Sequence, residues 1–220
     1  MGVCALMPMK SHSERVPNKN LKLFCGKPLY HSMMNQLLLA QTIDRIVVDT
    51  DSPDIKNDIK KNFEDIIIID RPASIQGDFV SMNKSIAYDL SILEGKDFIQ
   101  THSTNPLLKA KTIDNAVKQY LTDIKKYDSL FSVTKLQTRL YDKNLIPVMH
   151  NPRELIRTQD LEPLFEENSN FYIFSKSSFK NAKKERIGLK PNYSEINRLE
   201  AIDIDNEEDF IIAEAIMRRI

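Results

Sequence analysis

A cationic loop near the start of the chain carries residue types that bind a polyanion. The apolar run 3–7 is typical of a buried strand, and the loop follows it directly. Open α/β sheets hold their ligands at the carboxyl ends of strands, so a cationic loop at this place suits a bound polyanion. The alternative is an ordinary solvated surface loop. The loop's cations are Lys10, Arg15 and Lys19, and its small hydrogen-bonding side chains are Ser11, Ser13, Asn18 and Asn20.

Polar side chains at other expected strand ends could face the same site. Asp51 ends one expected strand, and Arg71 and Asp78 follow a second. Gln100 lies within a third, where burial would oblige its amide to find partners. Each has a plainer interpretation. Asp51 could be a helix-start carboxylate, Arg71 could lie on the surface, and Gln100 could bond a neighbouring backbone.

Two aspartates near the end of the chain, Asp203 and Asp205, suggest a cation site. In an expected strand over 201–205 these residues would project to the same face, because side chains alternate along a strand. Two close carboxylates repel each other unless a cation or water intervenes. Mg²⁺ binds one or two carboxylates together with substrate phosphate oxygens. The alternative is that Asp205 helps to start the last helix while Asp203 is exposed.

The elements that must position these residues alternate between strand and helix, which predicts a mostly parallel, three-layer α/β/α sandwich with right-handed crossovers. The isoleucine run 66–69 is typical of a strand buried on both faces. Ser52 and Asn206 are expected to cap helices. The expected strands are 3–7, 45–51, 66–69, 97–101, 129–136, 170–174 and 201–205, and the expected helices are 27–40, 53–63, 80–93, 112–126 and 207–220.

The composition limits the class of protein. The 220 residues suit one domain over 1–220, with an irregular excursion at 139–167. The formal net charge is zero, so no global field attracts nucleic acid or a membrane. No apolar run approaches the roughly 20 residues that span a bilayer, and we expect neither a signal peptide nor a disulfide framework. These features predict a cytoplasmic protein that binds no nucleic acid and no membrane.

Familiar catalytic motifs do not occur in the sequence. There is no P-loop, no G-x-G-x-x-G, no G-x-S-x-G and no H-E-x-x-H. The missing nucleophile motif argues against covalent acyl transfer. A charged site for positioning a phosphorylated substrate therefore remains the main hypothesis.

Taken together, these segments resemble the cytidylyltransferases that make CMP-activated acid sugars, namely the acylneuraminate (CMP-sialic acid synthetase) family with its legionaminate, pseudaminate and KDO relatives. That family opens with roughly Ile-Pro-Ala-Arg-x-Gly-Ser-Lys-x-Ile-Pro-x-Lys-Asn, followed by Gly-Lys-Pro-Leu. The resemblance covers nearly the whole chain. The matching segments are Met7-Pro-Met-Lys-Ser-His-Ser-Glu-Arg-Val-Pro-Asn-Lys-Asn20, Gly26-Lys-Pro-Leu29, Thr50-Asp51, Arg71-Pro72, Gln100-Thr-His-Ser-Thr-Asn-Pro-Leu107, Arg157-Thr-Gln-Asp160, 168–173 and Asp203-Ile-Asp205.

The resemblance implies a fold of the nucleotide-diphospho-sugar transferase type and transfer of CMP from CTP to an acidic sugar, with release of pyrophosphate and with Mg²⁺ as cofactor. Such a transfer needs positioning and charge neutralisation more than a covalent nucleophile. The resemblance also implies a homodimer that the excursion helps to form. It implies catalytic roles for Lys10, Lys19 and Asp203; nucleotide binding by Lys10, Ser11, Ser13, Arg15, Lys19, Asn20, Arg71, Asp78 and Ser81; acceptor binding by Gln100, Arg157 and Tyr172; and metal binding by Asp203 and Asp205.

The chain also departs from the family pattern. It has Lys10 for the family's arginine, Ser11 and His12 for its glycines, and Glu14 for its lysine. Side chains in place of glycine restrict how closely the backbone can approach phosphate. Two alternatives therefore stay open: CTP-dependent transfer to a different acceptor, such as a phosphonate, and a catalytically weak nucleotide-binding assembly protein.

Overall fold

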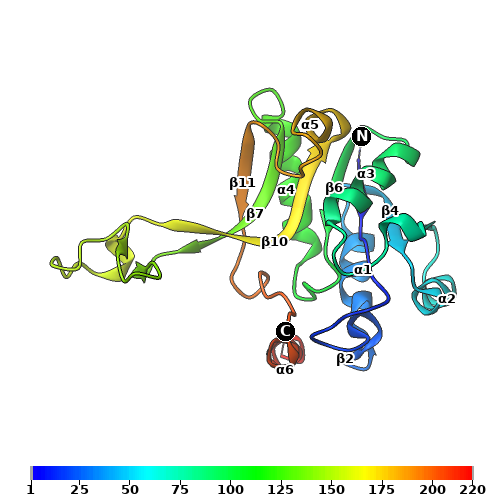
Figure 1. Ribbon diagram of the computed structural model, residues 1–220, viewed down its shortest axis with the longest axis horizontal. Helices are drawn as coiled ribbons and strands as arrows, with labels where there is room; N and C mark the ends of the chain where they lie inside the picture. The colour runs from blue at the N-terminus through cyan, green and yellow to red at the C-terminus, as the bar shows by residue number, and fades with distance from the viewer. Residues whose placement is uncertain (1, 220) are drawn as a thin grey trace.

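Strands and helices alternate along most of the chain (Figure 1). The computed structural model describes residues 2–219. The strands are β1 Val3–Leu6, β2 Leu23–Phe24, β3 Lys27–Pro28, β4 Ile43–Thr50, β5 Ile66–Asp70, β6 Asp97–Thr101, β7 Ser129–Leu136, β8 Leu140–Tyr141, β9 Pro147–Val148, β10 Leu164–Ser175 and β11 Pro191–Glu195. The α-helices are α1 Tyr30–Leu39, α2 Pro53–Asn62, α3 Met82–Ile92, α4 Ala110–Asp123, α5 Lys176–Asn181 and α6 Glu207–Met217.

A seven-stranded sheet in the order β11-β7-β10-β6-β1-β4-β5 forms the centre of the fold. Neighbouring strands run parallel, except that β10 is antiparallel to both β6 and β7. The sheet is therefore mostly parallel, as predicted. In a parallel sheet the carboxyl ends of the strands meet at one edge, and this places the loops after β1, β4 and β6 together.

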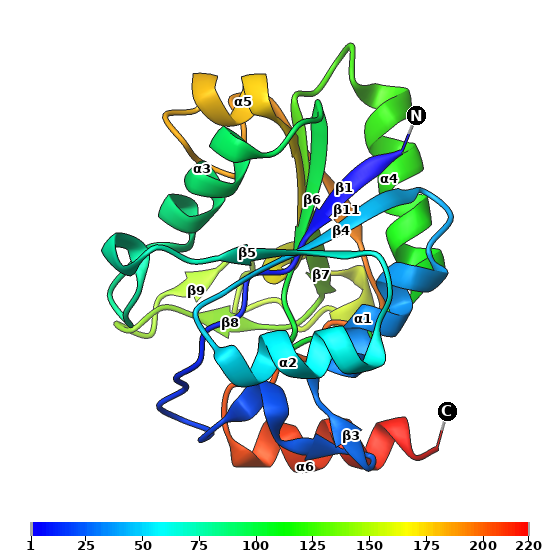
Figure 2. The same cartoon turned by 90° about the vertical axis from the view of Figure 1, so that its right-hand side faces the viewer.

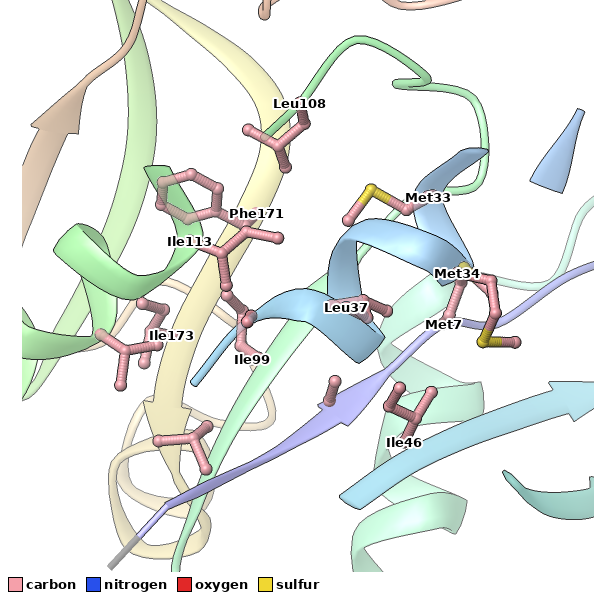
Figure 3. Close-up of a cluster of buried hydrophobic side chains, with 14 of the residues drawn as sticks. Met7, Met33, Met34, Leu37, Ile46, Ile99, Leu108, Ile113, Phe171 and Ile173 are labelled. Atoms are coloured by element: carbon pink, nitrogen blue, oxygen red, sulfur yellow. The ribbon is translucent and has the colours of Figure 1, made fainter. Parts of the chain in front are cut away.

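Helices cover both faces of this sheet (Figure 2). Alternate residues of β1 face opposite sides, as expected for a strand. Val3 and Ala5 belong to a core cluster that contains residues of α1, α2 and α4, whereas Cys4 and Leu6 pack with residues of α3 and α5. Figure 3 shows Leu37 of α1 within the first cluster. The predicted three layers are thus present.

The expected strand over 201–205 is wrong. These residues form an irregular segment that leads from a turn into α6. The Ile204 N–H donates to the Thr104 carbonyl at 2.9 Å, outside the sheet, and the Ile204 side chain packs against Phe24 and Phe210. At the edge of the sheet lies β11, a strand with little apolar character that we did not predict.

The prediction that 66–69 is buried on both faces is also wrong. This run forms β5, which is an edge strand, and Ile67 is 38% exposed. The helix caps are confirmed, because Ser52 accepts from the Ile55 N–H and Asn206 accepts from the Asp209 N–H. The expected helix end at residue 220 lies outside the described residues. Among residues 2–219, no helix has both the length and the apolar character needed to cross a membrane.

Strands β7 and β10 extend beyond the sheet as a two-stranded ribbon that carries an arm, defined here as residues 139–167 (Figure 1). The short hairpin β8–β9 lies in this arm. The arm projects away from the body of the molecule, and several of its large apolar side chains are exposed. These are Tyr141, Leu145, Ile146, Met149, Leu155, Ile156 and Phe165.

Candidate functional site

A hollow of about 330 Å³ opens between the cationic loop and the segments 102–104 and 203–205. It lies beyond the carboxyl ends of β1 and β6, where the sequence predicts a site. Its walls hold positive and negative side chains together, so a phosphate group there would meet several fixed charges. The predicted residues that the structure brings together in its walls are Lys10, Ser13, Arg15, Lys19, Asn20, Asp78, Asp203 and Asp205.

Lys19 lies at the centre of this charged wall. Its Nζ donates to the Ile204 carbonyl at 2.6 Å, between the two aspartates of the same segment. Burial lowers the pKa of Lys19, and the charges of Asp203 and Asp205 oppose that shift. The segment thus holds a partly desolvated ammonium at the backbone carbonyl between two aspartates, and a bound anion would find that ammonium already positioned.

The two aspartates differ in their surroundings. Arg15 Nη2 donates to Asp205 Oδ1 at 2.6 Å. Asp203 is half-buried, burial raises the pKa of its carboxyl group, and its Oδ1 has no hydrogen-bond partner among the described residues. Within residues 2–219, no group of three or more His, Cys, Asp or Glu side chains could hold a metal ion by itself. A cation at these two carboxylates would therefore need further oxygen ligands from a substrate, which is how Mg²⁺ commonly binds.

Asn20 fixes the shape of the cationic loop. Its Nδ2 donates to the Lys10 carbonyl at 3.1 Å, and its Oδ1 accepts from the Ser103 hydroxyl at 2.7 Å. The buried amide thereby joins both ends of the loop to the segment that follows β6. Its hydrogen bonds are made within the protein, so the geometry makes Asn20 a positioning residue for the cations.

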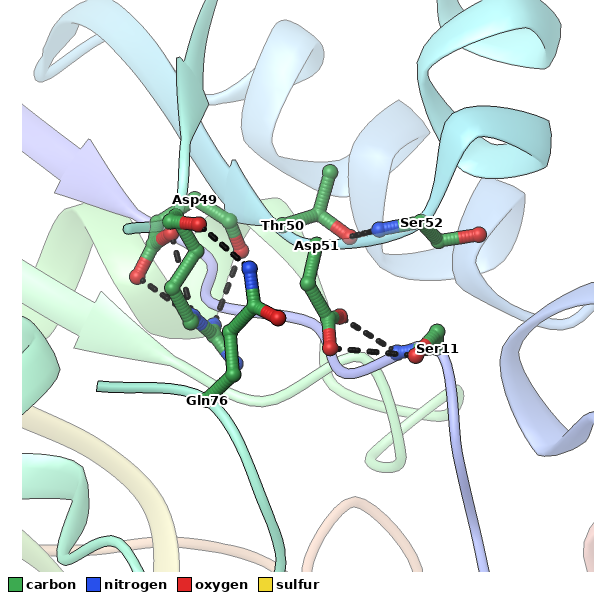
Figure 4. A network of polar contacts seen from close by, with 7 residues as sticks. Ser11, Asp49, Thr50, Asp51, Ser52 and Gln76 are labelled. Carbon is green, nitrogen blue, oxygen red and sulfur yellow. Dashed lines mark hydrogen bonds and ion pairs between the residues drawn. The ribbon is translucent and has the colours of Figure 1, made fainter. Parts of the chain in front are cut away.

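Asp51 and Asp78 hold the outer part of the loop. The Ser11 N–H and hydroxyl donate to the Asp51 carboxylate at 2.7 and 3.0 Å (Figure 4), and the Ser11 side chain lies outside the walls of the hollow. Lys10 Nζ lies 3.1 Å from Asp78, and His12 Nδ1 lies 3.2 Å from it. The hydrogen bond from Lys10 lowers the pKa of Asp78. Lys10, which the family resemblance assigns to phosphate binding, is thus paired with Asp78 in this structure.

Arg71, Ser81 and Arg157 are among the predicted residues that do not line the hollow. Arg71 is tied to Asp49, its Nε donating to both carboxylate oxygens at 3.0 and 3.1 Å, and its side chain is only 4% exposed. Ser81 caps α3 by accepting from the Asn83 N–H at 3.3 Å. Arg157 lies on the arm and donates to Asp160.

The predicted acceptor residues Gln100 and Tyr172 are neighbours across β6 and β10. Gln100 is buried, and its Nε2 donates to the Thr101 carbonyl at 2.9 Å. Its Oε1 accepts from Arg186 Nη1 at 2.6 Å, and the Arg186 guanidinium lies 4.0 Å from the centre of the Tyr172 ring. Arg186 was not predicted. In the sequence it is one of several charged residues in the run 183–186, and such a run is typical of an exposed surface turn.

The fold and the hollow define an α/β protein with a site of mixed charge beyond the carboxyl ends of its strands, the place where such folds bind nucleotides. A sequence model of the family described as Cytidylyltransferase matches residues 4–214. The chain belongs to this family.

Several named cytidylyltransferases resemble the chain. An N-acylneuraminate cytidylyltransferase from Streptococcus agalactiae serotype III (strain NEM316) is 26% identical over 218 residues, which cover 94% of this chain and 51% of the relative. The chain thus spans about half the length of that protein. A pseudaminic acid cytidylyltransferase from Campylobacter jejuni (strain 81-176) is 24% identical, with 97% of this chain and 95% of the relative covered.

Solved structures share the fold. A CMP:2-keto-3-deoxy-manno-octonic acid synthetase complexed with CTP superposes with a TM-score of 0.75 at 12% identity, covering 100% of this chain and 99% of that one. A 4-diphosphocytidyl-2C-methyl-D-erythritol synthase from Anaerococcus prevotii gives a TM-score of 0.67, also at 12% identity, covering 99% and 97%. At this identity the likeness concerns the fold alone.

Proposed function

We propose that this protein transfers CMP from CTP to an acidic sugar of the nonulosonate type and releases pyrophosphate, making an activated donor for surface polysaccharide or glycoconjugate synthesis. The observation that carries the proposal is the gathering of Lys10, Arg15 and Lys19 around one hollow with Asp203 and Asp205. Family membership and the relatives named above support the same reaction. The cytoplasm is the proposed location, in keeping with two free cysteines, Cys4 and Cys25.

The chemistry requires the protein to neutralise charge as it develops on the phosphates. Lys19 is fixed at the Ile204 carbonyl and would stabilise the transferring phosphate from one wall of the hollow. Lys10, now paired with Asp78, would meet the phosphate chain from the other wall. Arg15 would exchange its contact with Asp205 for a phosphate oxygen. Gln100 and Tyr172 would bind the acceptor.

Mg²⁺ is the proposed cofactor, held by Asp203 and Asp205. The unpartnered buried Oδ1 of Asp203 fits a cation ligand, and two carboxylates leave positions for phosphate oxygens. When bound, the ion would polarise the α-phosphate and lower the pKa of an acceptor hydroxyl.

The variant Asp203→Asn tests this assignment. We expect the Mg²⁺ concentration for half-maximal rate to rise by about tenfold or more, because one anionic ligand is lost. Pyrophosphate release during a Mg²⁺ titration measures it. Glu208→Gln is the matched control, since Glu208 is exposed at the start of α6 and outside the hollow, and its titration should match the wild type. An unchanged response in Asp203→Asn would remove the metal from this site.

The reaction itself is tested by incubating the protein with Mg²⁺, each nucleoside triphosphate in turn, and N-acetylneuraminate, pseudaminate or 3-deoxy-manno-octulosonate. We expect pyrophosphate release with CTP and at least one of these acids. Release only with a phosphonate acceptor would support the alternative acceptor class. CTP binding without turnover of any acceptor would support a nucleotide-binding assembly protein and contradict the proposal.

A homodimer joined through the arm completes the proposal. Leu145 and Leu155 on the arm are 80% and 92% exposed, and exposed apolar clusters of this kind mark interaction surfaces. Arg157, on the same arm, would then reach the second subunit. Light scattering after size exclusion should give a dimer for the wild type and a monomer for Leu145→Lys/Leu155→Lys. A monomeric wild type at micromolar concentration would rule out this assembly.

A further inference from the structure

Arg186 is a cation whose contacts within the protein are with neutral groups. It lies in the loop after α5 and is half-buried. Its Nη1 donates to the Gln100 amide oxygen, and its guanidinium stacks over the Tyr172 ring. Among residues 2–219, no carboxylate lies within ion-pair distance of it, and its Nε and Nη2 donate no hydrogen bond to another residue. A partly desolvated guanidinium of this kind is best neutralised by an anionic ligand.

The neighbours of Arg186 fix its plane. The Gln100 amide oxygen accepts a hydrogen bond from one edge of the Arg186 guanidinium, and the Tyr172 ring packs against one face of that group. The Tyr172 hydroxyl is itself held by Glu167 and Ser169, so the ring is fixed in turn. A guanidinium held in plane with its remaining N–H groups free is suited to bidentate recognition of a planar carboxylate.

His102 lines the hollow that holds Lys19 and is close enough to Arg186 to feel its charge. The ring of His102 lines the hollow, and its Nε2 is buried without a partner among the described residues. Burial lowers the pKa of His102 to about 4, and the charges of Arg186 and Lys19 both add to the shift. His102 is thus a buried neutral side chain under the influence of two cations, Lys19 in the wall of the hollow and Arg186 beside Gln100 and Tyr172.

We propose that Arg186 binds the carboxylate of the acceptor sugar. The inference rests on the proposed function, because it assumes that an acidic acceptor enters beside Gln100. The other cations of the site already contact carboxylates or a carbonyl of the phosphate wall, as Arg15 does with Asp205 and Lys10 with Asp78. Arg186 selects acidic acceptors because a neutral sugar would leave its guanidinium without an anionic partner.

Binding of acids and esters tests the assignment. Isothermal titration calorimetry would use N-acetylneuraminate, pseudaminate and 3-deoxy-manno-octulosonate, then the methyl ester of the tightest ligand. In Arg186→Met we expect the acid to bind about 10- to 100-fold more weakly. The ester should bind the variant and the wild type alike. Arg186→Lys should bind the acid more tightly than Arg186→Met but less tightly than the wild type, because lysine keeps the positive charge and lacks the planar guanidinium that binds a carboxylate through two hydrogen bonds.

A matched control separates this role from a structural one. Lys180→Met removes an exposed cation from α5, outside the acceptor residues, and should leave the affinity for every ligand unchanged. Arg186→Met should keep the wild-type affinity for CTP, whereas a distorted site would weaken CTP binding as well.

Three outcomes would overturn the assignment: equal binding of the acid by Arg186→Met and the wild type, equal loss for acid and ester, or no binding of any of the three acids by the wild type. The proposed function is judged separately, by pyrophosphate release from CTP with acidic and other acceptors. A protein that transfers CMP but binds the acid equally well in Arg186→Met would refute only the role of Arg186.

Discussion

Replacing Lys19 by alanine is expected to lower the turnover number for CMP transfer by about 100-fold or more, with the fold intact. The ammonium is held at the Ile204 carbonyl and is partly desolvated, so it costs little reorganisation when charge develops on the phosphates. Such fixed charges stabilise a transition state far more than mobile ones in water. Steady-state pyrophosphate release, at saturating CTP and acceptor, measures the effect.

Lys22→Ala is the matched control for this experiment. Lys22 lies one turn further along the chain, but it pairs with Glu207 and lies outside the hollow. Its loss should leave turnover within about twofold of the wild type, because an exposed ion pair contributes little. If Lys19→Ala retained wild-type turnover while keeping its CTP affinity, Lys19 would have no part in the chemistry.

The cationic loop could be predicted from the sequence because its information is local. An apolar strand followed by closely spaced cations places those cations at a strand end in any mostly parallel sheet. Lys10, Arg15 and Lys19 do line one hollow. Asp203 and Asp205 line it too, although the expected strand does not form. The pattern Ile202-Asp-Ile204 alternates like a strand, but Ile204 packs against α6 and not within the sheet.

Partners distant in the sequence could not be predicted in this way. Arg71 pairs with Asp49, 22 residues earlier, and no local pattern shows that this aspartate is buried inside β4. Arg186 meets Gln100 across 86 residues, at a turn that the sequence leaves unmarked. Both pairings depend on strand order, and strand order results from the packing of the whole chain.

Arg71→Met is expected to lower the free energy of unfolding by about 3–5 kcal/mol, because it leaves the buried Asp49 carboxylate without its cation. The loss should increase with pH. Burial raises the pKa of the nearby Asp89 to about 8, and the charge of Asp49 adds to that shift while Arg71 opposes it. A carboxyl whose pKa is raised in the folded state contributes stability at low pH and loses it as the pH rises through that value. Removing Arg71 takes away the charge that opposes the shift at Asp89, so the variant loses more stability than the wild type as the pH rises. Urea unfolding at pH 6 and pH 8 measures both effects.

Two further variants decide what Arg71 does. Arg157→Met breaks an exposed ion pair on the arm and should cost at most about 1 kcal/mol. The double variant Asp49→Asn/Arg71→Met removes both charges of the pair and should regain much of the stability lost in Arg71→Met, since residue 49 then carries no uncompensated charge. If Arg71→Met instead unfolded like the wild type and bound CTP more weakly, Arg71 would be a nucleotide ligand, as the family resemblance implies. The bidentate contact with a buried aspartate favours the structural role, because taking Arg71 away to bind phosphate would leave Asp49 charged in the core.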